Sequence, residues 1–180
     1  MFRSVSPTAK DSAHKLPGDN LIKDPTVVID SAFDLPAPPA EVFAWFLQLG
    51  KWRAGWYLPR KAEWFFIPSK RGLRHIEPKW LNLKVGDRIP DYGGKDGYFE
   101  CFYLDENRAI GYKSNRGKMT MTWVLTFWPA NDHTRVIIRL KIKTPTAKGK
   151  LFLKAGHLID RVTIAGLAAG LKERLIKTGD

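Results

Sequence analysis

The strongest hydrophobic pattern of the chain lies near its C-terminus. Residues 149–178 contain no proline, and apolar side chains recur there every three or four residues. This spacing is typical of one face of a helix. The apolar face carries Leu151, Phe152, Ala155, Leu158, Ile159, Val162, Ala165, Gly166 and Ala169. The pattern therefore predicts one long helix that packs against another layer of the protein.

Most of the chain before this helix has the pattern of strands. The alternation within residues 26–35 predicts a first strand, and the prolines that follow predict where it ends. Short helices are predicted at residues 41–49 and 60–66. Later strands are predicted at residues 88–91, 97–104, 108–114, 119–128 and 134–143. Their connections are short, which is typical of antiparallel neighbours.

The last two strands indicate that the sheet has one apolar face. Every second residue of 119–128 is large and apolar, and the residues between them are mostly threonine. In residues 134–143 the apolar positions are Val136, Ile138, Leu140 and Ile142, and the basic positions are Arg135, Arg139, Lys141 and Lys143. One face of the sheet is therefore expected to be apolar and the other polar.

This order of elements predicts an α+β fold. A curved antiparallel sheet of about six or seven strands is expected to wrap around the long C-terminal helix, with two short helices after the first strand. Residues 26–178 are expected to form this single domain, with a gap between sheet and helix. Residues 1–25 contain few large apolar side chains, so we expect them to form a flexible tail.

Composition adds constraints on the compartment. The chain has 180 residues and one cysteine, Cys101, so it cannot form an internal disulfide, which fits the reducing cytoplasm. The first residues lack the apolar run of a secretory signal. No stretch of eighteen apolar residues is present, so a membrane-spanning helix is not predicted. We therefore expect a cytoplasmic protein.

The formal net charge of +12 is the unusual bulk property. The sequence predicts a basic band formed by Arg135, Arg139, Lys141, Lys143, Lys148, Lys150 and Lys154. Such a band would favour contact with an anionic membrane surface or with nucleic acid. Aromatic residues do not alternate with these positions, so no platform for stacking bases is predicted. A solvated basic surface is the simplest interpretation.

Three motifs carry a resemblance to a known superfamily. Residues 53–57 read Arg-Ala-Gly-Trp-Tyr, residues 76–87 read Ile-Glu-Pro-Lys-Trp-Leu-Asn-Leu-Lys-Val-Gly-Asp, and residues 134–139 read Thr-Arg-Val-Ile-Ile-Arg. With the order of elements over residues 26–176, they resemble the SRPBCC superfamily of START-like, birch-pollen-allergen-like and polyketide cyclase/dehydrase-like proteins. The resemblance is strongest to an uncharacterised bacterial branch. It implies the helix-grip fold.

The resemblance also implies an apolar cavity between the sheet and the long helix. Such a cavity would bind or transport a hydrophobic small molecule, such as a lipid or a polyketide, without a cofactor. Residues expected to line it are Trp56, Tyr57, Trp64, Trp80, Met121, Trp123, Leu125, Phe127, Leu158 and Val162. Aromatic rings offer flat apolar surface to a ligand, although each of these residues is also compatible with an ordinary core position.

A cofactor-independent enzyme that uses the same cavity is the alternative. A cyclase, dehydratase or hydrolase would need acid–base side chains, and the candidates are His157, Glu100 and Tyr98. His157 and Asp160 share one side of the helix, away from its apolar face. No His-Glu-x-x-His motif or cysteine–histidine set is present, so no metal site is predicted.

Overall fold

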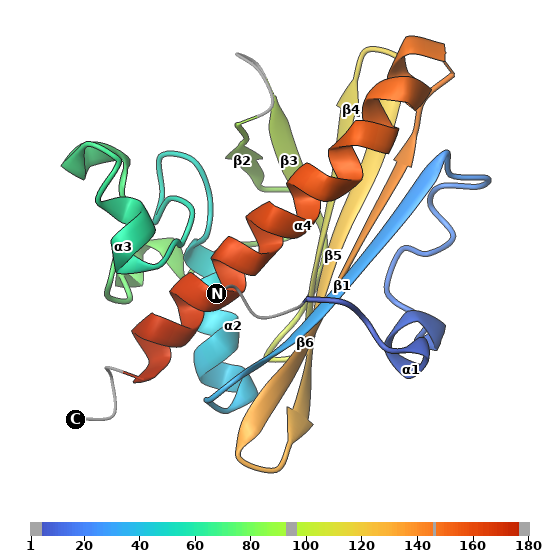
Figure 1. The fold of residues 1–180 in the computed structure, drawn as a ribbon. Coiled ribbons are helices and arrows are strands. Elements are labelled where there is room, and N and C mark those ends of the chain that lie inside the picture. Colours follow the sequence, from blue (N-terminus) through green and yellow to red (C-terminus); the bar gives the residue numbers. More distant parts are fainter. Residues whose placement is uncertain (1–4, 93–96, 146, 177–180) are drawn as a thin grey trace.

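The computed structural model of the chain describes residues 5–92, 97–145 and 147–176, and in the last range the side chains from Asp160 onward. Within these residues, six strands form one antiparallel sheet in the order β1-β6-β5-β4-β3-β2 (Figure 1). The strands are β1 (Val27–Leu35), β2 (Arg88–Pro90), β3 (Tyr98–Asp105), β4 (Ala109–Arg116), β5 (Met119–Ala130) and β6 (His133–Lys143).

One long helix lies diagonally across a face of this sheet (Figure 1). The helices are α1 (Ala9–Ala13), α2 (Pro39–Gln48), α3 (Arg60–Glu63) and α4 (Ala147–Ile176), with short 3-10 turns at Pro68–Lys70 and Pro78–Trp80. The predicted α+β class is confirmed: a curved antiparallel sheet, two short helices after the first strand, and a long C-terminal helix.

The pairing of β5 with β6 sets which side chains face the helices. Asn131 in their turn has a φ of 53°, a left-handed conformation that asparagine adopts more readily than most residues. The resulting register places Met121 opposite Ile142 and Trp123 opposite Leu140. The predicted apolar parity of both strands therefore forms one continuous surface.

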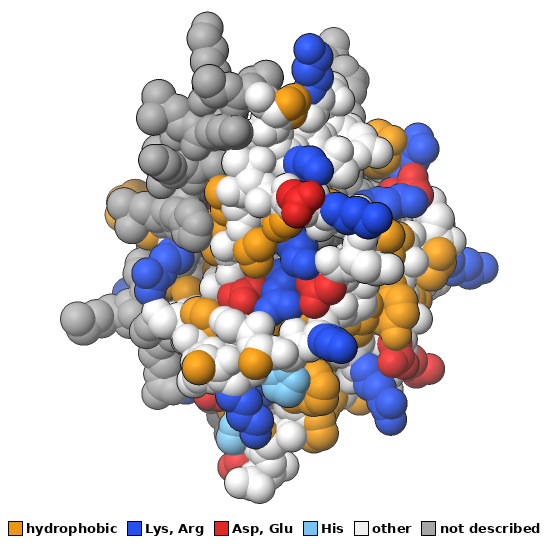
Figure 2. Space-filling model, turned by 90° about the vertical axis from the view of Figure 1, so that its right-hand side faces the viewer, with side chains coloured by type: hydrophobic (Ala, Val, Ile, Leu, Met, Phe, Trp, Pro, Cys, Tyr) orange, Lys and Arg blue, Asp and Glu red, His pale blue; other side chains and the backbone are white. Residues whose placement is uncertain are grey.

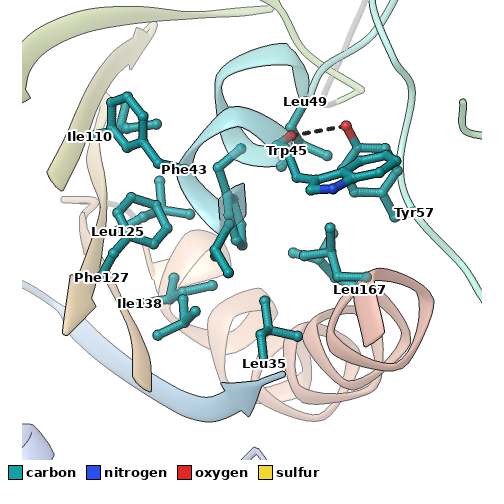
Figure 3. Close-up of a cluster of buried hydrophobic side chains, with 14 of the residues drawn as sticks. Leu35, Phe43, Trp45, Leu49, Tyr57, Ile110, Leu125, Phe127, Ile138 and Leu167 are labelled. Atoms are coloured by element: carbon teal, nitrogen blue, oxygen red, sulfur yellow. Dashed lines mark hydrogen bonds between the residues drawn. The ribbon is translucent and has the colours of Figure 1, made fainter. Parts of the chain in front are cut away.

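The main core lies where α2 and the C-terminal half of α4 meet this surface (Figure 3). Trp45 of α2 and Tyr57 are fully buried, and their rings meet edge to face with centroids 5.3 Å apart. The Tyr57 hydroxyl donates a hydrogen bond of 2.9 Å to the Trp45 carbonyl. This bond satisfies the polar end of a buried aromatic ring. Tyr57 is thus a core residue that fixes the segment after α2.

The described part of α4 agrees only partly with its predicted apolar face, of which Ala165 and Gly166 are buried. From Asp160 onward, its buried apolar side chains are Ile164, Ala165, Leu167, Ala168, Leu171 and Leu175. Val162, which the sequence placed on the buried face, is 57% exposed. At Gly170 the helix comes so close to Leu58 that an added Cβ would lie 2.6 Å from its backbone. The helix has overlapping apolar stripes, and this tertiary contact selects between them.

Residues 5–25 also differ from the predicted flexible tail, because they pack on the outer face of the sheet. Leu16 joins a small apolar cluster with Val124 and Ile137 on that face. The Val5 carbonyl accepts a 3.0 Å hydrogen bond from the Ala32 amide. A composition argument counts few large apolar residues here, but it does not count the carboxylates that pair with β6.

These carboxylates engage the predicted basic band. Arg135 pairs with Asp11 at 2.7 Å, and Lys141 pairs with Asp19 at 2.8 Å. Arg139 is buried between Asp30, at 2.7 Å, and Asp19, at 2.9 Å. Lys and Arg side chains on this side of the molecule are interspersed with carboxylates (Figure 2). The β6 part of the band is therefore not a free basic surface. The side chains of Lys148, Lys150 and Lys154 lie outside the described residues.

Candidate functional site

A pocket of about 850 Å³ lies between the sheet, the middle of α4 at residues 160–164 and the segment at residues 50–72. Its described lining includes Phe46, Leu58, Met121, Leu125, Leu140, Ile142 and Ile164. Exposed residues at its edge, among them Trp52 and Phe66, show that it opens to solvent. Its size and largely apolar lining are typical of sites for small organic ligands.

One side of the pocket consists of aromatic rings. Trp123 is at the centre: its ring centroid lies 6.3 Å from Trp56, 5.9 Å from Tyr112 and 5.9 Å from Phe99. The Trp56 and Tyr112 rings are nearly parallel to it, with interplanar angles of 27° and 24°. The arrangement gives a flat, rigid apolar surface, which suits a planar hydrophobic molecule.

Two buried donors of the pocket lining have no hydrogen-bond partner among the residues that the structure describes. They are Nε1 of Trp56 and Nε of Arg53. A buried donor without a partner costs about 1–3 kcal/mol, so such atoms are uncommon in native proteins. Both nitrogen atoms are covered by protein in this structure, so an acceptor atom on a bound ligand would reach them only after the neighbouring side chains shift. Sequence analysis selected Trp56 for its ring, but it did not select Arg53.

The Arg53 guanidinium is also a cation without a close counter-ion. Its Nη2 donates to the carbonyls of Leu47, at 2.9 Å, and Trp80, at 2.7 Å, and the group lies 4.9 Å above the Trp80 ring. Asp87 interacts with it electrostatically, but no described carboxylate is within ion-pair distance. Burial lowers the pKa of Arg53 below its ordinary value. The pocket therefore has a positive electrostatic potential on this side.

Other charges of the lining are partly neutralised by their neighbours. Glu63 pairs with Arg174 at 2.6 Å, and Asp91 pairs with Arg116. Burial alone would raise the pKa of Glu63, but the hydrogen bonds from Arg174 and Arg74 outweigh it, and the pKa lies below its ordinary value. These carboxylates are thus committed to arginines of the protein and do not balance Arg53.

The structure brings four of the predicted lining residues to this pocket. They are Trp56, Met121, Trp123 and Leu125. Tyr57 and Phe127 are buried in the core instead, and Trp80 supports Arg53. Trp64 is 78% exposed and does not line the pocket, and neither does Val162. The side chain of Leu158 lies outside the described residues.

The predicted acid–base residues do not meet in the pocket. Glu100 pairs with Lys113 at 3.0 Å and with Arg88 at 3.5 Å, and neither Glu100 nor Tyr98 lines the pocket. The Tyr98 ring lies 4.4 Å from the Arg88 guanidinium. The side chain of His157 is outside the described residues. Across the described residues, no group of three His, Cys, Asp or Glu side chains is placed to hold a metal ion.

Several pocket residues were not selected from the sequence. Leu140 and Ile142 share the apolar parity of β6, so the same alternation that selected Met121 could have identified them. Phe99 and Tyr112 depend on the register between β3 and β4, which shifts between Cys101 and Tyr103. Such an irregularity has no reliable sequence signal.

The sequence matches no family model, and the comparison with curated proteins gives no match. Solved structures do match the fold. A Mycobacterium smegmatis protein, Ms6760, is 17% identical with a TM-score of 0.53, over 83% of this chain and 91% of its own. MLL2253 of Mesorhizobium loti is 14% identical with a TM-score of 0.52, over 84% and 98% of the two chains.

An Arthrobacter aurescens protein gives a similar result, with 14% identity and a TM-score of 0.51 over 82% of this chain and 87% of its own. At these identities the likeness shows the fold alone. None of the helices in the described part of the chain is both long and apolar enough to cross a membrane.

Proposed function

We propose that the chain binds a hydrophobic small molecule with a planar apolar body and an acidic head group in this pocket. The observation that carries the proposal is the aromatic-lined pocket of about 850 Å³ between the sheet and α4. The fold and the three sequence motifs together support membership of the SRPBCC superfamily. The resemblance to that superfamily implies a hydrophobic small-molecule ligand, and the planar body and the acidic head group are inferred from this pocket. We also propose that the protein acts in the cytoplasm.

The apolar part of the ligand would supply much of the binding free energy. Burial of about 200 Å² of apolar surface is worth roughly 5 kcal/mol. The loss of translational and rotational freedom on binding costs a comparable amount, about 4 kcal/mol or more. Stacking on Trp56 and Trp123 favours planar groups beyond this area effect. Polar contacts therefore decide affinity and selectivity.

The head group is inferred from Arg53 and Trp56. Within the described part of the chain, each has a buried donor without a partner, and Arg53 lacks a close counter-ion. A carboxylate in the pocket would balance the charge of Arg53, which stays protonated in proteins, and a shift of the neighbouring side chains would let it accept a hydrogen bond from one of these donors. Charge-assisted hydrogen bonds are the stronger kind, so an acid is favoured over an ester or an alcohol.

Competition binding tests this proposal. An anilinonaphthalene sulfonate probe is bound to the protein and displaced with naphthoic acid or with its methyl ester. We expect saturable binding of one probe per chain, and the acid should compete at a concentration at least tenfold lower than the ester. Failure of both to compete would contradict the pocket function. Equal competition by both would contradict only the acidic head group.

A matched pair of tryptophan variants assigns the effect to the pocket. Trp56→Phe removes the unpartnered indole donor but keeps an aromatic ring, so it should reduce the preference for the acid while the ester still binds. Trp128→Phe makes the same change at a residue that does not line the pocket. The second variant should behave as the wild type does.

A further inference from the structure

Four consecutive large apolar residues of the chain lie exposed after α3. Trp64 is 78% exposed, Phe65 87%, Phe66 47% and Ile67 64%. Figure 1 shows α3 at the edge of the molecule, away from the sheet. Soluble monomers rarely expose a contiguous apolar patch of this kind, and such patches commonly mark interaction surfaces.

Basic side chains flank this apolar run on both sides. Arg60 and Lys61 precede it, and Lys70 and Arg71 follow it, and all four are exposed. The only acidic residue between positions 60 and 71 is Glu63, which is buried and paired with arginines. The solvent-exposed side of the segment is therefore apolar in the middle and cationic at both ends.

The segment is held in this position by a buried network. The Arg174 guanidinium, near the end of α4, donates to Glu63 at 2.6 Å and to the carbonyls of Leu73, at 2.7 Å, and Leu58, at 3.0 Å. The Arg60 amide donates to the Glu173 carboxylate at 2.8 Å. These bonds join both ends of the segment to α4. The exposure of Trp64 and Phe65 is therefore part of a defined structure and not of a loose loop.

Trp52 adds a further exposed ring at the same pocket. It is 74% exposed and has a φ of 61°, and Lys51 lies over its ring at 4.8 Å. A bulky residue in the left-handed region is strained, and such strain is commonly retained where a side chain has a role. Trp52, Phe66, Lys70 and Arg71 all line the pocket edge.

We propose that residues 60–71, with Lys51 and Trp52, form a docking surface for an anionic lipid bilayer. Tryptophan and phenylalanine insert at the boundary between head groups and acyl chains, and lysine and arginine attract anionic lipids. The cationic ends are the feature that favours a bilayer over a second copy of this chain, which also carries a net charge of +12. Since the surface borders the pocket, docking places the pocket opening against the lipid.

Vesicle co-sedimentation of the ligand-free protein tests this surface without reference to the small-molecule ligand. Vesicles of phosphatidylcholine alone are compared with vesicles that contain about 30% phosphatidylglycerol. We expect binding to the anionic vesicles that is at least tenfold tighter and that falls when salt is raised from about 50 to 500 mM. Equal binding to both vesicles, or none to either, would overturn the proposal.

Two pairs of variants test the residues. Trp64→Ser with Phe65→Ser should lower anionic-vesicle binding at least tenfold, whereas Val85→Ser, at another exposed apolar residue, should not. Lys61→Glu with Lys70→Glu should also lower anionic-vesicle binding at least tenfold. The control, Lys79→Glu with Lys118→Glu, should have little effect on that binding.

Gel filtration of the same variants tests whether a second copy of the chain, and not a lipid bilayer, covers this surface. The wild type should elute as a monomer at micromolar concentration, and Trp64→Ser with Phe65→Ser should not change its elution. A wild-type dimer that this variant dissociates would overturn the proposal, because a second copy would then cover the surface. Unchanged vesicle binding by both pairs of variants would overturn it as well.

Discussion

Gly170 of α4 lies in close contact with the backbone of Leu58, in the segment that follows Tyr57. Alanine is the better helix former by about 1 kcal/mol, so a glycine inside α4 lowers the intrinsic stability of the helix. A Cβ at this position would lie 2.6 Å from a backbone atom of Leu58, which cannot move without moving the segment. At Gly166, one turn earlier, the nearest atom is the Leu58 Cδ2, the end of a movable side chain, at 2.9 Å.

We therefore predict that Gly170→Ala destabilises the protein by about 1–3 kcal/mol, the usual cost of overpacking. Gly166→Ala is the matched control, and its loss of stability should be clearly smaller. The free energy of unfolding from urea titration checks both. A Gly170→Ala protein more stable than the wild type would show that α4 does not make this close contact with the Leu58 backbone.

At the same scale, the sequence could identify the Arg-Ala-Gly-Trp-Tyr motif but not what its residues do. Tyr57 and Trp56 are neighbours in the chain, yet one is a core residue and the other lines the pocket. Which donor of Arg53 is left without a partner depends on the backbone carbonyls that approach its guanidinium, those of Leu47 and Trp80. Such contacts form between segments that the local sequence does not relate.

The packing of the N-terminal segment also depends on contacts that the local sequence does not predict. Residues 5–25 are held on the outer face of the sheet by carboxylates, by backbone carbonyls that accept hydrogen bonds from β6 side chains, and by the buried Leu16. The hydrogen bond from Arg135 holds the pKa of Asp11 well below its usual range. Burial would raise the pKa of Asp19, but Lys141 and Arg139 outweigh it, and the pKa is lowered. Alternation predicted the strands well, whereas this packing depends on charge pairs between distant residues.

These shifts predict acid-sensitive packing of the segment. A carboxyl group whose pKa is lower in the folded state stabilises that state above its unfolded pKa, and this contribution is lost as the pH falls toward the folded pKa. For aspartate the loss begins near pH 4. We expect the free energy of unfolding to fall below that pH, and Asp11→Asn should show a shallower fall from a lower starting value.

Asp24→Asn is the control for this measurement, because Asp24 is exposed in the same segment. It should follow the wild-type pH dependence. Identical curves for the wild type and Asp11→Asn between about pH 3 and 7 would show that the Asp11–Arg135 pair does not stabilise the folded state.

At the scale of the whole molecule, the two-layer fold was predictable because the strands alternate strictly and one element alone could cover the apolar face. The same reasoning predicted a gap between the layers. It predicted only part of the pocket lining: Trp56, Met121, Trp123 and Leu125 line the pocket, whereas most of the lining residues from the irregular segment at residues 50–72 were not selected. It also placed Val162 on the buried face of α4, whereas Val162 is 57% exposed.

The pocket itself can be tested with two neighbouring positions of α4. Thr163 lines the pocket and Val162 does not, although both are exposed. Thr163→Trp should obstruct the space and weaken binding of an apolar fluorescent probe at least tenfold, while Val162→Trp should bind as the wild type does. Equal, unimpaired binding by both variants in the same titration would contradict a ligand site between the sheet and α4.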